Sequence, residues 1–283
     1  MKFALCNEVL QPLPFARQCE LAAAMGYDGL EVAPFTLAPD PTQLTDAEIA
    51  GFRRTAEDHG LAIFGLHWLL VAPTGLSIVS PDAALRARTQ QVMVQLVELC
   101  AALGGSYLVH GSPKQRSVPE GSTREQAWER ARECLAAAAA AAARCGVTYC
   151  LEPLSSRETD LFNTVEEAAR MVADIGVPAL RTMIDCSAAG QAEALPVHEL
   201  MARWMPTGLV GHVQVNDPNR RGPGQGALEF GPILRVLQAM ERHGHFPGIV
   251  GVEPFDYVPD GPGCAAHSIG FLRGVLQGLE SHG

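Results

Sequence analysis

The amino-acid sequence predicts an α/β protein folded as a single-domain (β/α)8 barrel. Eight short apolar segments alternate with eight longer segments of helical pattern along the 283 residues. Strands that alternate with helices are typical of a parallel sheet, and eight such pairs in a chain of this length are typical of a barrel. The alternative is a doubly wound open sheet, but no G-x-G-x-x-G motif follows an early strand and no phosphate-loop motif is present.

The expected strands are short runs rich in apolar residues, bounded by polar residues or by glycine and proline. In chain order they span residues 3–9, 29–32, 63–68, 107–111, 148–154, 181–186, 209–215 and 248–254. No segment between them is long or disordered enough to divide the chain, so we expect one domain over residues 1–283.

The expected helices lie between these strands, at residues 15–25, 46–59, 81–103, 123–145, 164–175, 197–204, 232–243 and 263–279. Ser80 followed by Pro81 is typical of an N-cap with proline in the first turn. Three pairs make a capping-box pattern: Thr45 with Glu48, Ser122 with Glu125, and Thr164 with Glu167. Glycines are expected to end six helices: Gly26, Gly60, Gly104, Gly146, Gly176 and Gly244.

Composition and charge exclude several classes of protein. A chain with 47% apolar residues is typical of a globular protein, and the net charge of −10 argues against broad binding to nucleic acid. The longest apolar run, residues 134–145, is too short to span a membrane, and residues 1–14 do not resemble a signal peptide. The eight scattered cysteines are expected to be reduced thiols in a cytoplasmic protein.

Polar side chains gather where the expected strands end, which is where barrel enzymes carry their active sites. They are Asn7, Glu8, Glu31, His67, His110, Glu152, Glu158, Asp185, His212, Gln214, Asn216, Asp217, Glu253 and Asp256. Buried carboxylates without a compensating charge are costly, so a bound cation is expected. A site rich in oxygen ligands with few thiols suits a hard divalent cation, Mg²⁺ or Mn²⁺.

Several of these positions have two readings. His110 is either a satisfied histidine at the rim of the barrel or a ligand, and Glu31 either contacts substrate or supports a ligand. Lys114 and Arg116 either line the entrance or are solvated. The segment RRGPGQG, residues 220–226, resembles a phosphate cradle, but it lacks the Lys-Ser/Thr pair, so a loop that covers the site is expected.

Four motifs resemble those of a known family. They are LEPLSSRE at 151–158, MIDCS at 183–187, HVQVNDPNRRGPGQG at 212–226 and GVEPF at 251–255. Together they resemble the sugar isomerase/epimerase group of xylose-isomerase-like TIM barrels, which includes ketose 3-epimerases and hydroxypyruvate isomerase. The resemblance covers most of the chain as a pattern, and its specific motifs lie in the second half.

The resemblance implies one divalent metal ion held by four residues, which here are Glu152, Asp185, Gln214 and Glu253. The seventh strand carries the H-x-Q form of hydroxypyruvate isomerases, whereas ketose 3-epimerases usually show H-x-H. His212 points the same way as Gln214, because alternate residues of a strand share a face, and is therefore the reserve ligand.

The resemblance also implies roles around the substrate. Glu152 and Glu253 correspond to the acid/base pair of the family, Glu158 to a contact with a substrate hydroxyl, and Arg220 to the substrate-binding arginine. Two further candidate substrate contacts are His67 and His212. One departure is Ala188, which stands where the family often has a histidine that contacts a substrate oxygen.

These residues predict a divalent-metal-dependent sugar isomerase or epimerase. It would transfer a proton through a metal-stabilised ene-diolate on a small ketose, keto-acid or sugar derivative. The first alternative is a metal-dependent dehydratase or lyase of the same superfamily, like those acting on inososes or dehydroshikimate. A nuclease and a non-catalytic sugar-binding barrel are further alternatives, and the acidic charge argues against the nuclease. Family members are commonly homo-oligomers, so a homo-oligomer is possible here.

Overall fold

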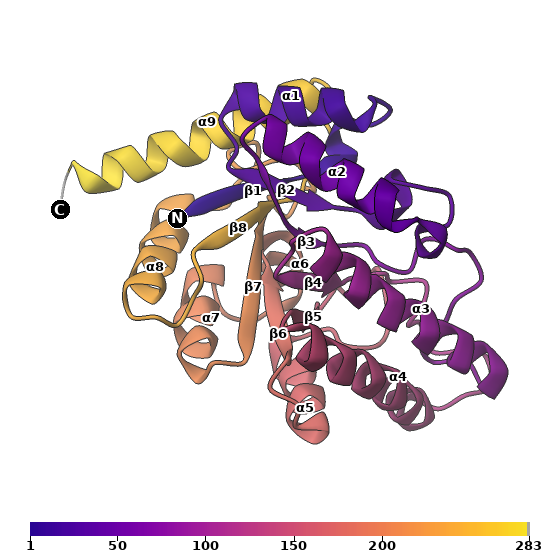
Figure 1. The fold of residues 1–283 in the computed structure, drawn as a ribbon. Helices are drawn as coiled ribbons and strands as arrows, with labels where there is room; N and C mark the ends of the chain where they lie inside the picture. The colour runs from indigo at the N-terminus through magenta and orange to yellow at the C-terminus, as the bar shows by residue number, and fades with distance from the viewer. Residues whose placement is uncertain (282–283) are drawn as a thin grey trace.

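The structure, a computed structural model, describes residues 1–281 and contains a closed barrel of parallel strands. Each strand pairs with its neighbours in sequence, and β1 closes the barrel by pairing with β8. The strands are β1 (Lys2–Cys6), β2 (Gly29–Val32), β3 (Ala62–Leu66), β4 (Tyr107–His110), β5 (Thr148–Leu151), β6 (Leu180–Asp185), β7 (Val210–Val215) and β8 (Ile249–Val252). The predicted (β/α)8 fold is confirmed (Figure 1).

Helices cover the outside of the barrel (Figure 1). The α-helices are α1 (Phe15–Met25), α2 (Asp46–Asp58), α3 (Ala83–Ala102), α4 (Arg124–Cys145), α5 (Val165–Ile175), α6 (Cys186–Ala192), α7 (Val197–Trp204), α8 (Phe230–Arg242) and α9 (Gly261–Glu280). Short 3₁₀ helices are η1 (Asn7–Leu10), η2 (Pro34–Thr36), η3 (Pro41–Gln43) and η4 (Met205–Thr207). The expected helices all form within a few residues of their predicted ends, and α6 and the 3₁₀ helices were not predicted.

The first strand is shorter than the sequence predicts, and this difference matters for the site. The apolar run was expected to stay extended to residue 9, but β1 ends at Cys6 and the chain turns into η1. The side chain of Asn7 holds this turn, because its Oδ1 accepts a hydrogen bond from the amide of Ala33. The turn carries Glu8 to the mouth of the barrel.

Helix ends follow the predicted chemistry with three corrections. Thr45 and Glu48 form the expected reciprocal capping box. At α5, Thr164 accepts from the amide of Glu167, but the Glu167 side chain accepts from the amide of Asn163, so this box is not reciprocal. The box at α4 lies one residue later than predicted, on Thr123 and Gln126. The N-cap of α3 is Asp82, because Ser80 instead accepts a hydrogen bond from the amide of Asp82. The six predicted glycines all have positive φ angles, which allow the chain to leave a helix without steric cost.

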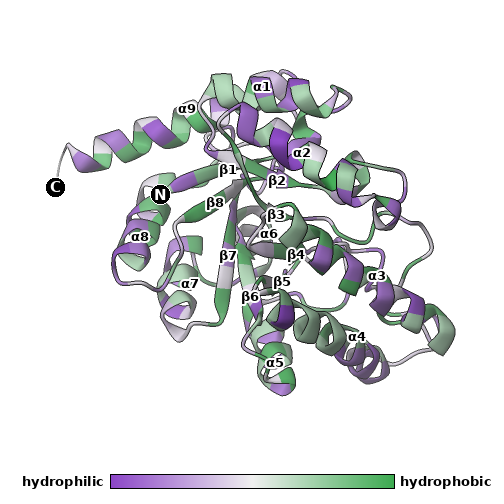
Figure 2. Ribbon diagram, viewed as in Figure 1, coloured by the Kyte–Doolittle hydropathy of each residue, from purple (hydrophilic) through white to green (hydrophobic). Residues whose placement is uncertain are grey.

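The core has two parts. The larger lies between the helices and the outer face of the barrel, and the strands that form this face are mostly hydrophobic in Figure 2. The smaller fills the barrel interior, with Ala4, Phe64, Tyr107, Val109, Cys150 and Met183. These residues leave the carboxyl end of the interior to polar side chains.

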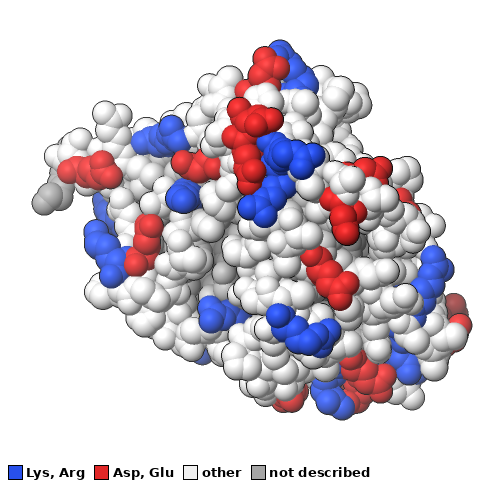
Figure 3. All heavy atoms as spheres, in the orientation of Figure 1, with Lys and Arg blue, Asp and Glu red and all other residues white. Residues whose placement is uncertain are grey.

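On the face drawn in Figure 3, basic and acidic side chains are interspersed, and neither sign forms a large patch. None of the helices within residues 1–281 is both long and apolar enough to cross a membrane.

Candidate functional site

Three carboxylates from three strands meet at the carboxyl end of the barrel. Glu152 follows β5, Asp185 ends β6 and Glu253 follows β8. One oxygen of each lies within 4.8 Å of the other two, and each residue is only 4% exposed. The structure therefore brings together three of the four metal ligands that the sequence predicts, and we call them the carboxylate site.

The backbone around Glu152 is shaped to receive its carboxylate. Gly111, just after β4, lies so close that a Cβ atom there would overlap Oε2 of Glu152. Arg116 donates from Nη1 to the backbone oxygen of Glu152 at 2.6 Å. Arg116 is fully buried, which excludes the solvated position considered for it, whereas Lys114 is exposed. The amide of Arg116 donates to the carbonyl of Pro113, and this turn directs the guanidinium inward.

Asp185 is held in place by two hydrogen bonds. As the N-cap of α6 it accepts from the amide of Ala188 through Oδ1 at 2.7 Å. Its Oδ2 accepts from Nδ2 of Asn216 at 2.8 Å. Asn216 also donates to the backbone oxygen of Glu253 at 2.9 Å, so one amide group links the ends of β6 and β8.

The electrostatics of the carboxylate site favour a bound cation. Burial, and then the charges of Glu253 and Asp185, raise the pKa of Glu152 well above its usual value. Burial raises the pKa of Asp185 to about 7, against hydrogen bonds that lower it, and raises that of Glu253 to about 8 despite the contact with His67. Oε2 of Glu253 is buried and has no hydrogen-bond partner among the described residues. Clustered carboxylate oxygens, one still free, fit a hard divalent cation.

Gln214, the predicted fourth ligand, has a carbonyl oxygen available for binding. It lies opposite Asp185 in the register of β6 with β7. Its Nε2 donates to Oε1 of Glu31 at 2.6 Å, while Oε1 of Gln214 is buried and unpartnered within residues 1–281. Because Glu31 is a carboxylate, it must accept from Nε2 of Gln214, so Oε1 of Gln214 is the atom that remains free among the described residues. An amide oxygen is a suitable ligand for Mn²⁺ or Mg²⁺.

Below Gln214, the fully buried Glu31 organises the barrel interior. Besides Gln214, it accepts from the hydroxyl of Tyr107 at 2.7 Å and contacts Nε2 of His212 at 2.9 Å. Burial raises the pKa of Glu31, but the charge of His212 and these hydrogen bonds outweigh it and bring it to about 2. Of the two readings of Glu31, the geometry matches support of a ligand.

His212 was expected to be the reserve ligand or a substrate contact. The structure places it in this lower network, stacked on the Tyr107 ring with 4.0 Å between centroids. The two-residue alternation correctly put His212 and Gln214 on one face, and both contact Glu31. His212 is two residues deeper in the barrel, and it is outside the set of described residues that line the cavity.

A cavity of about 90 Å³ opens beside the carboxylate site. Its lining residues are Trp68, Gly111, Pro113, Glu152, Leu154, Glu158, Arg220, Glu253 and Phe255. Four of the predicted site residues are therefore in its wall. A larger groove, about 950 Å³, runs between α6, α7 and the loop after β7, and within the described chain it includes none of the three carboxylates.

The outer wall of the cavity combines an ion pair with aromatic rings. Arg220 contacts Glu158 at 3.2 Å and lies over the ring of Phe255 at 4.7 Å. The ring of Trp68 packs edge-on against Phe255 at 6.0 Å. Trp68 and Arg220 both have positive φ angles, 51° and 70°, which are rare for residues other than glycine. Such strain at two cavity residues is typical of a functional site. The sequence motifs identified Glu158 and Arg220 but not the aromatic wall.

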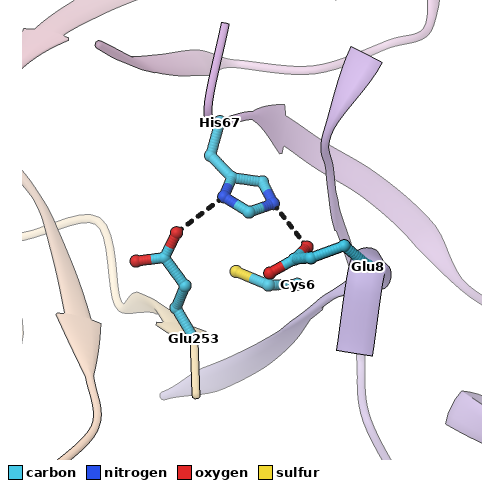
Figure 4. A group of neighbouring side chains, drawn as sticks. All are labelled: Cys6, Glu8, His67 and Glu253. Carbon is cyan, nitrogen blue, oxygen red and sulfur yellow. Dashed lines mark hydrogen bonds and ion pairs between the residues drawn. The ribbon is translucent and has the colours of Figure 1, made fainter. Parts of the chain in front are cut away.

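His67 lies behind the cavity, between two carboxylates (Figure 4). Its Nδ1 is 2.8 Å from Glu253 and its Nε2 is 2.9 Å from Glu8. Cys6 completes this group: one ligand atom from each of the four residues lies within 4.8 Å of the others. His67 was expected to touch substrate, but the structure places it on Glu253. Glu8 was noted at a strand end without a role, and no spacing in the sequence relates it to His67.

Comparisons with known proteins bear on this site. A family model described as a xylose isomerase-like TIM barrel matches residues 19–275. A D-psicose 3-epimerase of Agrobacterium fabrum is 28% identical over 249 residues, which cover 85% of this chain and 79% of that protein. An L-ribulose 3-epimerase of Mesorhizobium japonicum is 29% identical over 199 residues, covering 69% and 64%.

Solved structures agree on the fold. A D-psicose 3-epimerase from Clostridium cellulolyticum H10, crystallised with D-tagatose, superposes with a TM-score of 0.82 at 21% identity. The superposition covers 98% of this chain and 99% of that one. At this identity the likeness establishes the barrel alone.

Proposed function

Since this chain belongs to the xylose isomerase-like TIM barrel family, we propose that it is a divalent-metal-dependent epimerase acting on a small ketose. The observation that carries the proposal is the meeting of Glu152, Asp185 and Glu253 within 4.8 Å at the mouth of the barrel. The relatives named above are ketose 3-epimerases, which favours this reaction over the dehydratase alternative.

The proposed metal ligands are Glu152, Asp185, Glu253 and the carbonyl oxygen of Gln214. Their donor set is entirely oxygen, which favours Mn²⁺ or Mg²⁺. When bound, such an ion polarises a carbonyl group and neutralises negative charge on neighbouring oxygens. The chain supplies the rigidity: Asn216 and the amide of Ala188 fix Asp185, and Glu31 fixes the amide of Gln214.

The proposed acid/base pair is Glu152 and Glu253. Both line the cavity, and they come from β5 and β8, so they reach it from different strands. One carboxylate takes the proton from the carbon next to the carbonyl, and the other carboxyl group returns a proton to the opposite face of that carbon. The result is inversion at one carbon with no net change in protons. Acid–base help of this kind accelerates a reaction by roughly 10²–10⁴-fold.

The proposed substrate contacts are Glu158 and Arg220, and their pairing indicates what they recognise. The charge of Arg220 is already balanced by Glu158 at 3.2 Å, so the pair suits sugar hydroxyls better than a phosphate group. The cavity of about 90 Å³ is well below the roughly 300–1,000 Å³ of pockets for drug-sized ligands, which favours a short, unphosphorylated ketose.

The reaction is tested by incubating the protein and Mn²⁺ with D-psicose, L-ribulose and shorter ketoses in deuterated water. We expect the 3-epimer to appear carrying one deuterium at the inverted carbon, and Glu152→Gln and Glu253→Gln to abolish the exchange. A product lighter by one water would instead support the dehydratase. No exchange with any ketose, in protein shown to contain metal, would overturn the proposal.

A further inference from the structure

A second group of metal-binding side chains lies beside the carboxylate site and shares Glu253 with it. Cys6, Glu8, His67 and Glu253 each offer one ligand atom, and these atoms all lie within 4.8 Å of one another (Figure 4). We propose that this group, called here the Cys6 centre, binds a second divalent cation of the zinc class. The charge balance given below rests on the metal of the proposed function, whereas the ligand geometry does not depend on it.

The ligand types differ from those of the carboxylate site. A thiol, an imidazole and two carboxylates are the side chains that zinc uses in proteins, whereas Mg²⁺ and Mn²⁺ prefer oxygen alone. The four residues come from separate elements: Cys6 ends β1, Glu8 lies in η1, His67 follows β3 and Glu253 follows β8. Four ligands delivered by separate elements to one buried point are typical of a built metal site.

The geometry around His67 suits a bound ion. Its Nε2 and Oε2 of Glu8 are 2.9 Å apart, close to the roughly 3 Å that separates two ligands bound at about 2.0–2.2 Å to one ion. Its Nδ1 is 2.8 Å from Oε1 of Glu253. A histidine that binds metal through one nitrogen usually donates the other N–H to a carboxylate, and Glu253 is placed to accept it.

Two carboxylate oxygens of the Cys6 centre need a partner that the protein does not supply. Oε1 of Glu8 and Oε2 of Glu253 are buried and unpartnered in the part of the chain that the structure describes. Figure 4 shows the sulfur of Cys6 between these two carboxylates. Buried polar atoms of native proteins nearly always have a partner. An ion at the carboxylate site would serve Oε2 of Glu253, so Oε1 of Glu8 is the atom that calls for a second cation.

The charge balance leaves room for one more positive group. Glu8, Glu152, Asp185 and Glu253 are all buried and form one continuous acidic cluster, with Arg116 as a neighbouring buried cation. One divalent ion at the carboxylate site together with Arg116 balances three of these four charges. The remaining charge requires either a protonated His67 or a second cation. A protonated His67 leaves Oε1 of Glu8 without a partner within residues 1–281, whereas a cation would serve this oxygen and could also take the sulfur of Cys6, which otherwise donates to Oε1 of Glu31 at 3.7 Å.

The test uses Co²⁺ as the probe, because cobalt bound by a thiolate gives a charge-transfer band in the near ultraviolet. Metal-free protein is loaded with Co²⁺, freed of excess ion, and analysed for cobalt content and absorption. We expect two equivalents and a thiolate band in the wild type. Cys6→Ser should lose the thiolate band and bind only one equivalent of Co²⁺. Glu8→Gln should also bind only one equivalent. Cys19→Ser, which alters a buried thiol on α1, is the matched control and should keep both equivalents.

Asp185→Asn separates this inference from the proposed function, because Asp185 belongs to the carboxylate site alone. If the wild type has both sites, Asp185→Asn should still bind one equivalent of Co²⁺ and show the thiolate band. If the wild type binds one equivalent of Co²⁺ and shows no thiolate band, the Cys6 centre is overturned. The proposed function then remains intact if Asp185→Asn loses that one equivalent. The band is measured in the unaltered protein, so the outcome does not depend on whether any variant folds.

Discussion

Gly111 faces the carboxylate of Glu152 so closely that a Cβ atom at residue 111 would overlap its Oε2. Because residue 111 is glycine, the loop after β4 leaves space for the carboxylate of Glu152. A side chain there would push a proposed metal ligand and acid/base group out of the carboxylate site.

We therefore expect Gly111→Ala to lower kcat by about 10²-fold, the size of effect known for small displacements of catalytic groups. Epimerisation kinetics and a Mn²⁺ titration measure it, and the affinity for Mn²⁺ should fall with kcat. Gly274→Ala in α9, where a Cβ atom meets nothing within 4 Å, is the control and should be unchanged. Wild-type kinetics in Gly111→Ala would show that Glu152 does not act from its present position.

Arg220→Ala is expected to raise KM at least tenfold, because the proposed hydroxyl contact and the partner of Glu158 are lost together. The free energy of unfolding should change by less than about 1 kcal/mol, since the ion pair is half exposed. Arg221→Ala is the matched control: Arg221 lies on the same loop and pairs with Asp256 at 2.9 Å outside the cavity lining formed by the described residues. Equal effects of the two substitutions on KM would argue against a role for Arg220 in binding.

Tyr107→Phe tests the network under the site. Removing the hydroxyl deprives the fully buried Glu31 of a donor at 2.7 Å, and we expect the protein to lose about 1–3 kcal/mol of unfolding free energy. Urea denaturation measures the change. The half-buried Tyr257 gives a comparison substitution, Tyr257→Phe, that should cost much less. Unchanged stability in Tyr107→Phe would mean that water or another donor replaces the hydroxyl at no cost.

The barrel could be predicted because it depends on local patterns, and the carboxylate site because those patterns were joined by the resemblance to a known family. Strand and helix periods gave the order of elements, and the carboxyl ends of parallel strands must meet at one end of a barrel. These patterns placed a larger set of polar residues at that end, and the resemblance to a known family singled out Glu152, Asp185 and Glu253 among them. The two-residue period also placed His212 on the face of Gln214.

The rest depended on contacts between distant segments. The structural role of His212 depends on its contact with Glu31, 181 residues away. The inward turn of Arg116 depends on a loop whose path has no periodic pattern. The turn at η1 that carries Glu8 to His67 depends on a hydrogen bond that Asn7 accepts from the amide of Ala33, just after β2. Such contacts leave no spacing signal in a single sequence.

The measurement that tests the central claim most directly is a Mn²⁺ titration of metal-free wild type and Asp185→Asn, followed by epimerisation kinetics of the same samples. Asp185→Asn keeps the size of the side chain and removes the charge of one proposed ligand. We predict that Mn²⁺ restores activity to the metal-free wild type. In Asp185→Asn, Mn²⁺ should neither bind at the carboxylate site nor restore activity. The control Asp174→Asn, on the exposed face of α5, should behave as the wild type does. An Asp185→Asn variant that fills that site and turns over substrate as the wild type does would contradict the account.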